Sequence, residues 1–147
     1  MDLGLNGLRA IVTGGSKGIG RKIVELLVQE GCDVGFCARG QESVDATLGD
    51  LSQADGTVIG GVADVTDDKG FRAWLLETAD QLGGLDILVP NASALGPAAD
   101  EDAWRTGLEV DVLGTVRAVE AALPHLKQSK AASIVGISST AAINTAG

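Results

Sequence analysis

Short runs of apolar residues alternate along this chain with longer stretches in which apolar residues recur every three or four positions. The short runs indicate buried strands, and the longer periodic stretches indicate helices that bury one face. The expected strands are Leu8–Val12, Val34–Ala38, Gly56–Val62, Leu85–Val89 and Ser133–Ile137.

Four helices are expected between these strands. The first spans Ile19–Glu30 and ends at Gly31, because glycine commonly follows a helix C-terminus. Thr66 is the expected N-cap of the third helix, and the last helix is expected to run from about Glu101 to Gln128. The apolar faces of the second and third helices consist of Val44, Leu48 and Leu51, and of Phe71, Trp74, Leu75 and Leu82.

Strands that alternate with helices of ten or more residues pair in parallel through right-handed crossovers. The sequence therefore predicts an α/β fold, a doubly wound parallel sheet with helices on both faces. Its length of 147 residues favours a single domain over residues 1–147. Ligands of such sheets bind beyond the carboxyl ends of the strands. The loops expected to rim that crevice are Thr13–Gly20, Arg39–Gly40, Asp64–Val65, Pro90–Gly96 and the residues from Ser138 onward.

Acidic residues outnumber basic ones and give a formal net charge of −9, with no run of Lys or Arg. Nucleic acid and membranes are therefore not expected as partners. No apolar stretch is as long as a membrane-spanning helix, and the first residues lack the basic region of a signal peptide, so a cytoplasmic location is expected. Cys32 and Cys37 are expected to be reduced and to face opposite sides of the sheet. Together with a single histidine they do not form a zinc site, and no metal is expected.

Residues 13–20 read T-G-G-S-K-G-I-G, between the first strand and the first helix. Glycines let the backbone turn sharply and approach a pyrophosphate, whose charge is stabilised by the free N–H groups of a helix N-terminus. The alternative is a plain turn between strand and helix. The candidate cofactor-binding residues of this loop are Gly14, Ser16, Lys17, Gly18, Ile19 and Gly20.

Four motifs at consecutive strand ends favour the binding interpretation. They are Thr13-Gly14-x-x-x-Gly18-x-Gly20, Asp64-Val65, Asn91-Ala92 and Ile137-Ser138-Ser139. In this order the sequence resembles the short-chain dehydrogenase/reductase family, which implies a Rossmann fold whose C-terminal strands and helices are absent from these 147 residues. The resemblance also implies that Asp64 and Val65 bind the adenine edge and that Asn91 and Ala92 lie along the ribose and nicotinamide. It further implies that Ser139 hydrogen-bonds the substrate carbonyl.

The end of the second strand bears on the choice of cofactor. Enzymes that use NAD usually place a carboxylate there, which binds the ribose 2′-hydroxyl and repels a 2′-phosphate. This strand instead ends in Cys37-Ala38-Arg39, and Lys17 is expected to point toward the same corner. A guanidinium and an ammonium suit a phosphate, so NADP is the expected cofactor. The alternative is that both are ordinary solvated cations.

Two positions depart from the family pattern. Residues 90–93 read P-N-A-S where the family usually has Asn-Asn-Ala-Gly. Asp111 stands where the family commonly has an asparagine that holds a water in a proton relay, so the resemblance makes Asp111 a candidate catalytic residue. A carboxylate only accepts hydrogen bonds, whereas an amide also donates, so the relay would be rewired or the pKa of Asp111 raised by burial. The alternative is a locally satisfied, partly exposed aspartate.

The family's Tyr-x-x-x-Lys pair follows the serine, but this sequence has no tyrosine and ends at Gly147. The expected function is hydride transfer between NADP(H) and a carbonyl or alcohol substrate, with this chain as the N-terminal part of the enzyme. The alternative is a dinucleotide-binding module without catalysis, or a truncated inactive fragment.

The 101–128 helix carries two apolar stripes. One contains Trp104, Leu108, Asp111, Thr115 and Ala118, and the other contains Val112, Val116, Val119 and Leu123. One stripe is expected to face the sheet and the other a partner subunit, which predicts a homo-oligomer.

Overall fold

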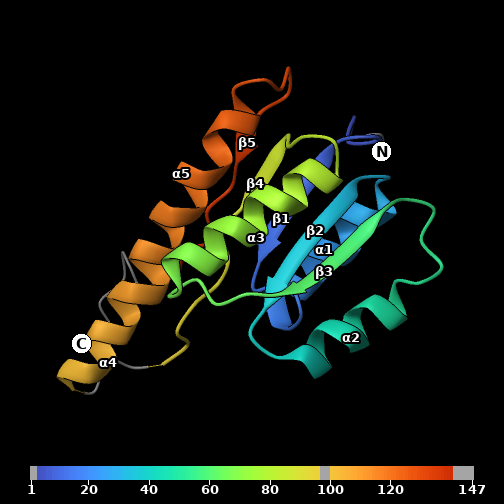
Figure 1. The fold of residues 1–147 in the computed structure, drawn as a ribbon. Coiled ribbons are helices and arrows are strands. Elements are labelled where there is room, and N and C mark those ends of the chain that lie inside the picture. The colour runs from blue at the N-terminus through green and yellow to red at the C-terminus, as the bar shows by residue number, and fades with distance from the viewer. Residues whose placement is uncertain (1–2, 97–99, 141–147) are drawn as a thin grey trace.

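The computed structural model describes residues 3–96 and 100–140 of the chain. Five parallel strands form one sheet in the order β3-β2-β1-β4-β5 (Figure 1). The predicted doubly wound α/β class is confirmed. The strands are β1 (Arg9–Thr13), β2 (Asp33–Ala38), β3 (Val58–Val62), β4 (Ile87–Val89) and β5 (Ser133–Ile134). The helices are α1 (Gly18–Gln29), α2 (Gln41–Asp50), α3 (Asp68–Gln81), α4 (Glu101–Gly107), the π-helical segment η1 (Leu108–Leu113) and α5 (Gly114–Leu126).

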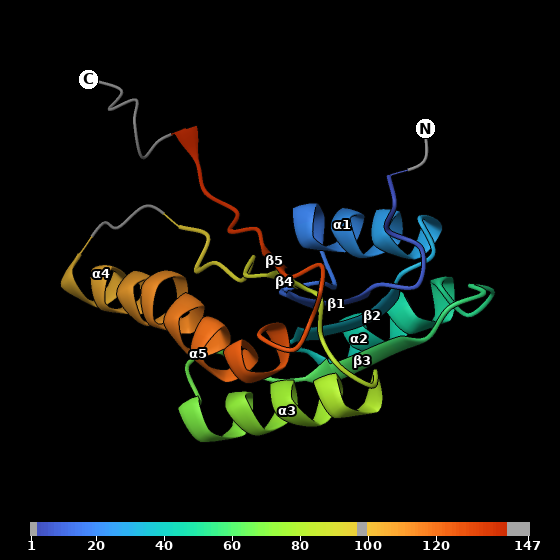
Figure 2. The same cartoon turned by 90° about the horizontal axis from the view of Figure 1, so that it is seen from above.

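Helices cover both faces of the sheet, with α1 on one side and α3 and α5 on the other (Figure 2). The alternation of side chains along each strand divides the core in the same way. In β1, Ala10 and Val12 pack with Val24 of α1, whereas Ile11 packs with Phe71 and Leu75 of α3. The central strands β1, β2 and β4 are therefore buried over most of their length, as expected for a parallel sheet covered on both faces, whereas both residues of β5 are exposed.

The two cysteines follow this division. Both are free and buried, Cys32 in the layer of α1 and Cys37 in the layer of α3. Their expected placement on opposite faces is confirmed.

The N-cap of α3 differs from the prediction. Asp67, not Thr66, caps the helix, and its carboxylate accepts a hydrogen bond from the Gly70 N–H at 3.2 Å. Thr66 instead donates to Asp64, so it belongs to the preceding loop. A Thr-Asp-Asp sequence offers three consecutive capping residues, and the local pattern does not distinguish among them.

The predicted single helix over residues 101–128 is also wrong in detail, because η1 interrupts it between α4 and α5. A π-helical turn accommodates one extra residue and shifts the faces of the helix that follows. The faces predicted from uninterrupted spacing therefore mix buried and exposed positions. Of the first predicted stripe, Ala118 is buried while Trp104 and Leu108 are exposed. The side of α5 that packs on the sheet is formed mainly by small residues and Leu126, namely Gly114, Ala118, Ala121, Ala122 and Leu126.

Strand β5 is shorter than predicted, although its backbone pairing continues. The N–H of Val135 donates to the Leu88 carbonyl and the N–H of Ile137 donates to the Pro90 carbonyl, at 2.9 and 3.1 Å. None of the helices in the described ranges has both the length and the apolar character to span a bilayer.

Candidate functional site

The strand order reverses direction at β1, which has β2 on one side and β4 on the other. Asn91, just beyond β4, joins the two strand ends there. Its Nδ2 donates to the carbonyls of Thr13 and Gly14, each at 3.1 Å. The Thr13 hydroxyl in turn accepts from the N–H groups of Asn91 and Ala92, each at 3.0 Å. These four bonds fix the carboxyl ends of the central strands, at the point where doubly wound sheets bind their ligands.

The glycine loop leads directly into α1. Lys17 is the N-cap residue, and no side chain caps the first N–H groups of the helix. Gly18 has a φ of +54°, and a Cβ added there would meet no atom within 4 Å. The loop therefore presents an open space next to unpaired helix N–H groups, which suits an anion.

Ser16 and Ser43 connect the glycine loop to α2. The Ser16 hydroxyl donates to Ser43 Oγ at 3.0 Å, and the Ser43 hydroxyl donates to the Gly40 carbonyl at 2.9 Å. Gly40 is the N-cap residue of α2 and directly follows Arg39. The ends of β1 and β2 are thereby held together by side chains as well as by the strand pairing.

Arg39 differs from the other arginines of the described residues. Arg9, Arg21, Arg72, Arg105 and Arg117 each form ion pairs, but Arg39 makes no hydrogen bond or ion pair within residues 3–96 and 100–140. Lys17 also has no such partner in that part of the chain. Both side chains are exposed, and β2 ends without a carboxylate.

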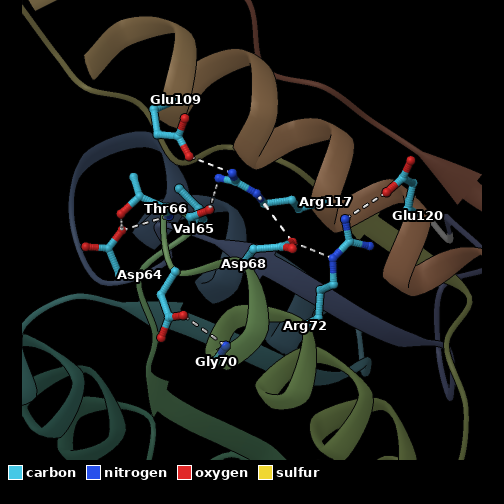
Figure 3. Close-up of polar contacts among 10 residues, drawn as sticks. Asp64, Val65, Thr66, Asp68, Gly70, Arg72, Glu109, Arg117 and Glu120 are labelled. Atoms are coloured by element: carbon cyan, nitrogen blue, oxygen red, sulfur yellow. Dashed lines mark hydrogen bonds and ion pairs between the residues drawn. The ribbon is translucent and has the colours of Figure 1, made fainter. Parts of the chain in front are cut away.

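The loop after β3 is shaped by Asp64. Its Oδ1 accepts from the N–H of Thr66 at 2.9 Å and from the Thr66 hydroxyl at 2.8 Å (Figure 3). The backbone hydrogen bond from Thr66 is the main cause that lowers the pKa of Asp64, and the positive charge of Arg39 contributes. The carboxylate is therefore ionised at neutral pH, and its second oxygen has no hydrogen bond among the described residues.

Arg117 of α5 is a residue of this region that the sequence analysis missed. Its guanidinium donates from Nη1 to the carbonyl of Val65 at 2.9 Å and from Nη2 to Glu109 at 2.6 Å. Val65 itself is buried against α5, where a Cβ on Gly114 would lie 2.9 Å from Val65 Cγ2. Arg117 lies on a helix among small and apolar residues, and a charge in such a position requires a partner, which is the signal that could have identified it.

Asp111 lies in η1 and is exposed. Its Oδ2 accepts from the N–H of Ala94 at 3.2 Å, so it attaches the loop after β4 to the helix. The same loop and the helix line an open pocket of about 450 Å³ that includes Ser93, Leu95, Trp104 and Asp111. This geometry fits the alternative of a locally satisfied, partly exposed aspartate.

Ser139 follows the last strand pairing, two residues after the N–H of Ile137 that donates to Pro90. Asn91 directly follows Pro90. Ser139 and Asn91 thus extend from the carboxyl ends of neighbouring strands, as the motif order predicts.

No group of three or more His, Cys, Asp or Glu side chains that could hold a metal ion occurs within the described residues. Burial raises the pKa of Cys37, at the end of β2, to about 12, so this thiol is not a reactive nucleophile at neutral pH.

Comparison with known proteins gives the family. The model of the short chain dehydrogenase family matches residues 9–146. The chain belongs to this family. An isoepoxydon dehydrogenase of Penicillium expansum is 32% identical over 140 residues, which cover 92% of this chain and 53% of that relative. An L-fucose dehydrogenase of Mus musculus is 39% identical over 140 residues, which cover 91% of this chain and 49% of that relative.

Solved structures agree with this assignment to the short-chain dehydrogenases. A short chain dehydrogenase from Burkholderia cenocepacia in complex with NADP aligns with a TM-score of 0.90 at 32% identity, covering 97% of this chain and 60% of that one. A 7α-hydroxysteroid dehydrogenase complexed with NADH and a 7-oxo bile acid aligns with a TM-score of 0.88 at 26% identity, covering 95% and 56%. The chain spans about half the length of the relatives it matches.

Proposed function

We propose that residues 1–147 form one dinucleotide-binding domain of an NADP-dependent oxidoreductase, which acts on a small carbonyl or alcohol substrate. When bound, the nicotinamide cofactor supplies or accepts the hydride. Membership of the short-chain dehydrogenase family supports the reaction class. The choice of NADP depends on this chain's own residues, since the structural relatives include complexes with NADP and with NADH.

The glycine loop fits a pyrophosphate. The uncapped N-terminus of α1 offers N–H donors, and the space in front of Gly18 would be filled by a Cβ. Ser16 and Ile19, on either side of Lys17-Gly18, are proposed to complete this cradle. Gly20 packs closely under the loop, where an added Cβ would collide with Asn91 and the Gly14 carbonyl, so it shapes the loop from beneath.

The observation that carries the NADP assignment is that Arg39, just beyond β2, and Lys17, in the glycine loop, form no ion pair within the described residues. An arginine without an acidic partner retains all its donors for a ligand, and a guanidinium binds phosphate through two parallel hydrogen bonds. Lys17 adds a second positive charge from the glycine loop. No carboxylate at the end of β2 opposes a 2′-phosphate.

The adenine and substrate positions follow the family motifs. Asp64 and Val65 are proposed to bind the adenine edge, with the unbonded carboxylate oxygen of Asp64 accepting from the adenine amino group. Ala92 is proposed to lie along the ribose and nicotinamide, and Asn91 to hold that segment in place through Thr13 and Gly14. The Ser139 hydroxyl is proposed to hydrogen-bond the substrate oxygen. Asp111 contributes by positioning the Ala94 loop.

A second candidate is nucleotide binding without catalysis by this chain alone. The 147 residues contain no tyrosine, and a serine hydroxyl does not titrate near neutral pH, so Ser139 alone does not replace the family's proton donor. Under this proposal the proton donor comes from outside these residues. Full activity and the substrate preference then depend on the remainder of the protein.

We also propose self-association through the segment formed by α4, η1 and α5, where the sequence predicted one helix over 101–128. Its exposed side carries large apolar residues, with Trp104 exposed to 62% and Leu108 to 53%. Val112, Val116 and Leu123 of the same segment are also exposed. Contiguous exposed apolar surface is typical of an interface between subunits. Light scattering of the purified protein checks this, and a monomer at micromolar concentration would contradict it.

A cytoplasmic location remains part of the proposal.

Nucleotide titration tests the proposed function directly. NADPH and NADH are titrated separately into the purified protein by calorimetry. Binding of NADPH at least about tenfold tighter than NADH is expected, since the 2′-phosphate gains charge-assisted hydrogen bonds worth about 1.5–3 kcal/mol. Equal affinities would remove the NADP assignment, and no binding of either would remove the dinucleotide site.

A further inference from the structure

We propose that Arg117 is a positioning residue for adenine recognition, which holds the loop 64–66 in the shape that presents the Asp64 carboxylate. The inference rests on the proposed nucleotide site. It assigns a role to a helix residue that lies outside the glycine loop and outside the four motifs that identify the family.

The position of Arg117 follows from three partners on three different segments (Figure 3). Nη1 donates to the Val65 carbonyl, Nη2 donates to Glu109 of η1, and Nε lies 3.4 Å from Asp68 at the start of α3. The side chain is only 14% exposed. A planar guanidinium held at both ends by carboxylates has little freedom to turn, so the backbone bond to Val65 has a fixed direction.

The loop 64–66 is determined by contacts at both of its sides. On one side, Thr66 donates twice to Oδ1 of Asp64. On the other side, Arg117 fixes the Val65 carbonyl, and the Val65 side chain packs against Gly114. The peptide between Val65 and Thr66 contains that carbonyl and the N–H that donates to Asp64. Holding the carbonyl therefore orients the N–H, and the N–H orients the carboxylate.

The charges around Arg117 favour this arrangement. Glu109 and Asp68 neutralise the guanidinium, so its burial costs less than that of an isolated charge. Arg72 belongs to the same network, since it pairs with Asp68 and with Glu120. Arg72 bridges α3 and α5 but makes no hydrogen bond or ion pair with the loop 64–66, which makes it a matched control for the loss of one arginine from the network.

The test compares two ligands that differ only at the adenine edge. NADPH carries an amino group there, and the reduced hypoxanthine analogue carries a carbonyl oxygen in its place. A carboxylate accepts a hydrogen bond from the amino group but faces an acceptor in the analogue. We expect the unmutated protein to bind NADPH about tenfold tighter than the analogue, the equivalent of one hydrogen bond to a charged group. In Arg117→Met this preference is expected to fall to about twofold or less, mainly through weaker NADPH binding.

The Arg72→Met variant provides the control, and it is expected to keep the preference. Deuterium exchange gives a second readout without ligand: Arg117→Met should speed exchange in the peptide that contains residues 64–67, and Arg72→Met should leave it unchanged. If Arg117→Met fails to fold, Glu109→Gln must show the same direction of change, because it removes one carboxylate that holds the guanidinium.

The outcomes separate the inference from the proposed function. An unmutated protein that binds neither ligand overturns both. If the unmutated protein binds both ligands equally, or if Arg117→Met weakens both by the same factor, the positioning role is overturned and the nucleotide site stands. An unchanged preference in Arg117→Met, or in Glu109→Gln where only that variant folds, also overturns it.

Discussion

Arg9 and Asp86 form an ion pair through two contacts at the amino-terminal edge of the sheet. This edge is opposite the one that carries the candidate nucleotide site. Nε of Arg9 lies 2.8 Å from Oδ2 of Asp86, and Nη2 donates to Oδ1 at 3.0 Å. The Ser129 hydroxyl and the backbone N–H of Arg9 also donate to this carboxylate. Together, with the Arg9 side chain as the largest cause, they lower the pKa of Asp86 to about 2.

This pair predicts how stability depends on pH. A carboxyl whose pKa is lower in the folded state stabilises the fold above its unfolded pKa of 3.8 and loses that contribution as pH falls toward 2. The shift corresponds to about 2 kcal/mol. Asp86→Asn should therefore lower the free energy of unfolding by about 2 kcal/mol at pH 7, and the difference from the unmutated protein should shrink between pH 4 and pH 2.

Urea denaturation at several pH values measures this difference. Glu101→Gln serves as the control, because it breaks the exposed pair with Arg105 and should cost less than about 1 kcal/mol at any pH. A difference for Asp86→Asn that stays constant from pH 7 to pH 2.5 would contradict the linkage.

A comparison of two variants separates the effect of a Gly18 side chain on nucleotide binding from the backbone strain that the substitution causes. Gly18→Val places a side chain in the space proposed for the pyrophosphate, and nucleotide binding should be abolished. Gly83 has a φ of +79° and equally open surroundings, but it lies at the end of α3, away from the carboxyl edge. Gly83→Val therefore suffers similar left-handed strain of about 1–2 kcal/mol and should retain binding. Calorimetric titration of both folded variants with NADPH decides, and binding by Gly18→Val would show that the loop is only a turn.

Replacing Asn91 by a charged residue is expected to destabilise the fold more than replacing it by a smaller one. In the unmutated protein, Nδ2 of Asn91 donates to the carbonyls of Thr13 and Gly14. In Asn91→Asp, a carboxylate oxygen takes the place of this donor and faces the two carbonyl oxygens. The variant should lose about 2–3 kcal/mol of stability at pH 7, because two partly buried hydrogen bonds are replaced by repulsion. Asn91→Ala loses the same bonds without the repulsion and should be the milder change. Chemical denaturation of the two variants ranks them, and the reverse order would mean that the assigned amide orientation is wrong.

The sequence predicted the elements whose signal is local, and it missed those that depend on a partner distant in the sequence. Apolar runs located the cores of the strands, and Gly31 marked the end of α1, since it directly follows the C-cap residue Glu30. The π-helical segment was missed because the apolar residues of 101–128 also fit uninterrupted helical spacing, so the sequence does not show the extra residue. The N-cap of α3 was assigned one residue early among three equivalent candidates.

The candidate site shows the same division. The four motifs occur at the strand ends in the predicted order, since each motif directly follows an apolar run. Arg117 was overlooked because a charged helix residue usually faces solvent, and its partners Val65 and Asp68 are about fifty positions away in the chain. The bond from Asp111 to Ala94 was likewise not predictable, because it depends on how η1 turns.

Arg39 provides the sharpest test of cofactor choice. Arg39→Asp removes the only arginine in the described ranges without an ion pair and places a carboxylate at the end of β2, where it would repel a 2′-phosphate and accept from a 2′-hydroxyl. NADPH binding should weaken by about tenfold or more, while NADH binding should be retained or improved. Lys127→Asp changes the net charge by the same amount at the far end of α5, so it should alter neither affinity by more than about twofold. If the two variants weaken NADPH binding equally, the effect comes from overall charge, and Arg39 does not bind the 2′-phosphate.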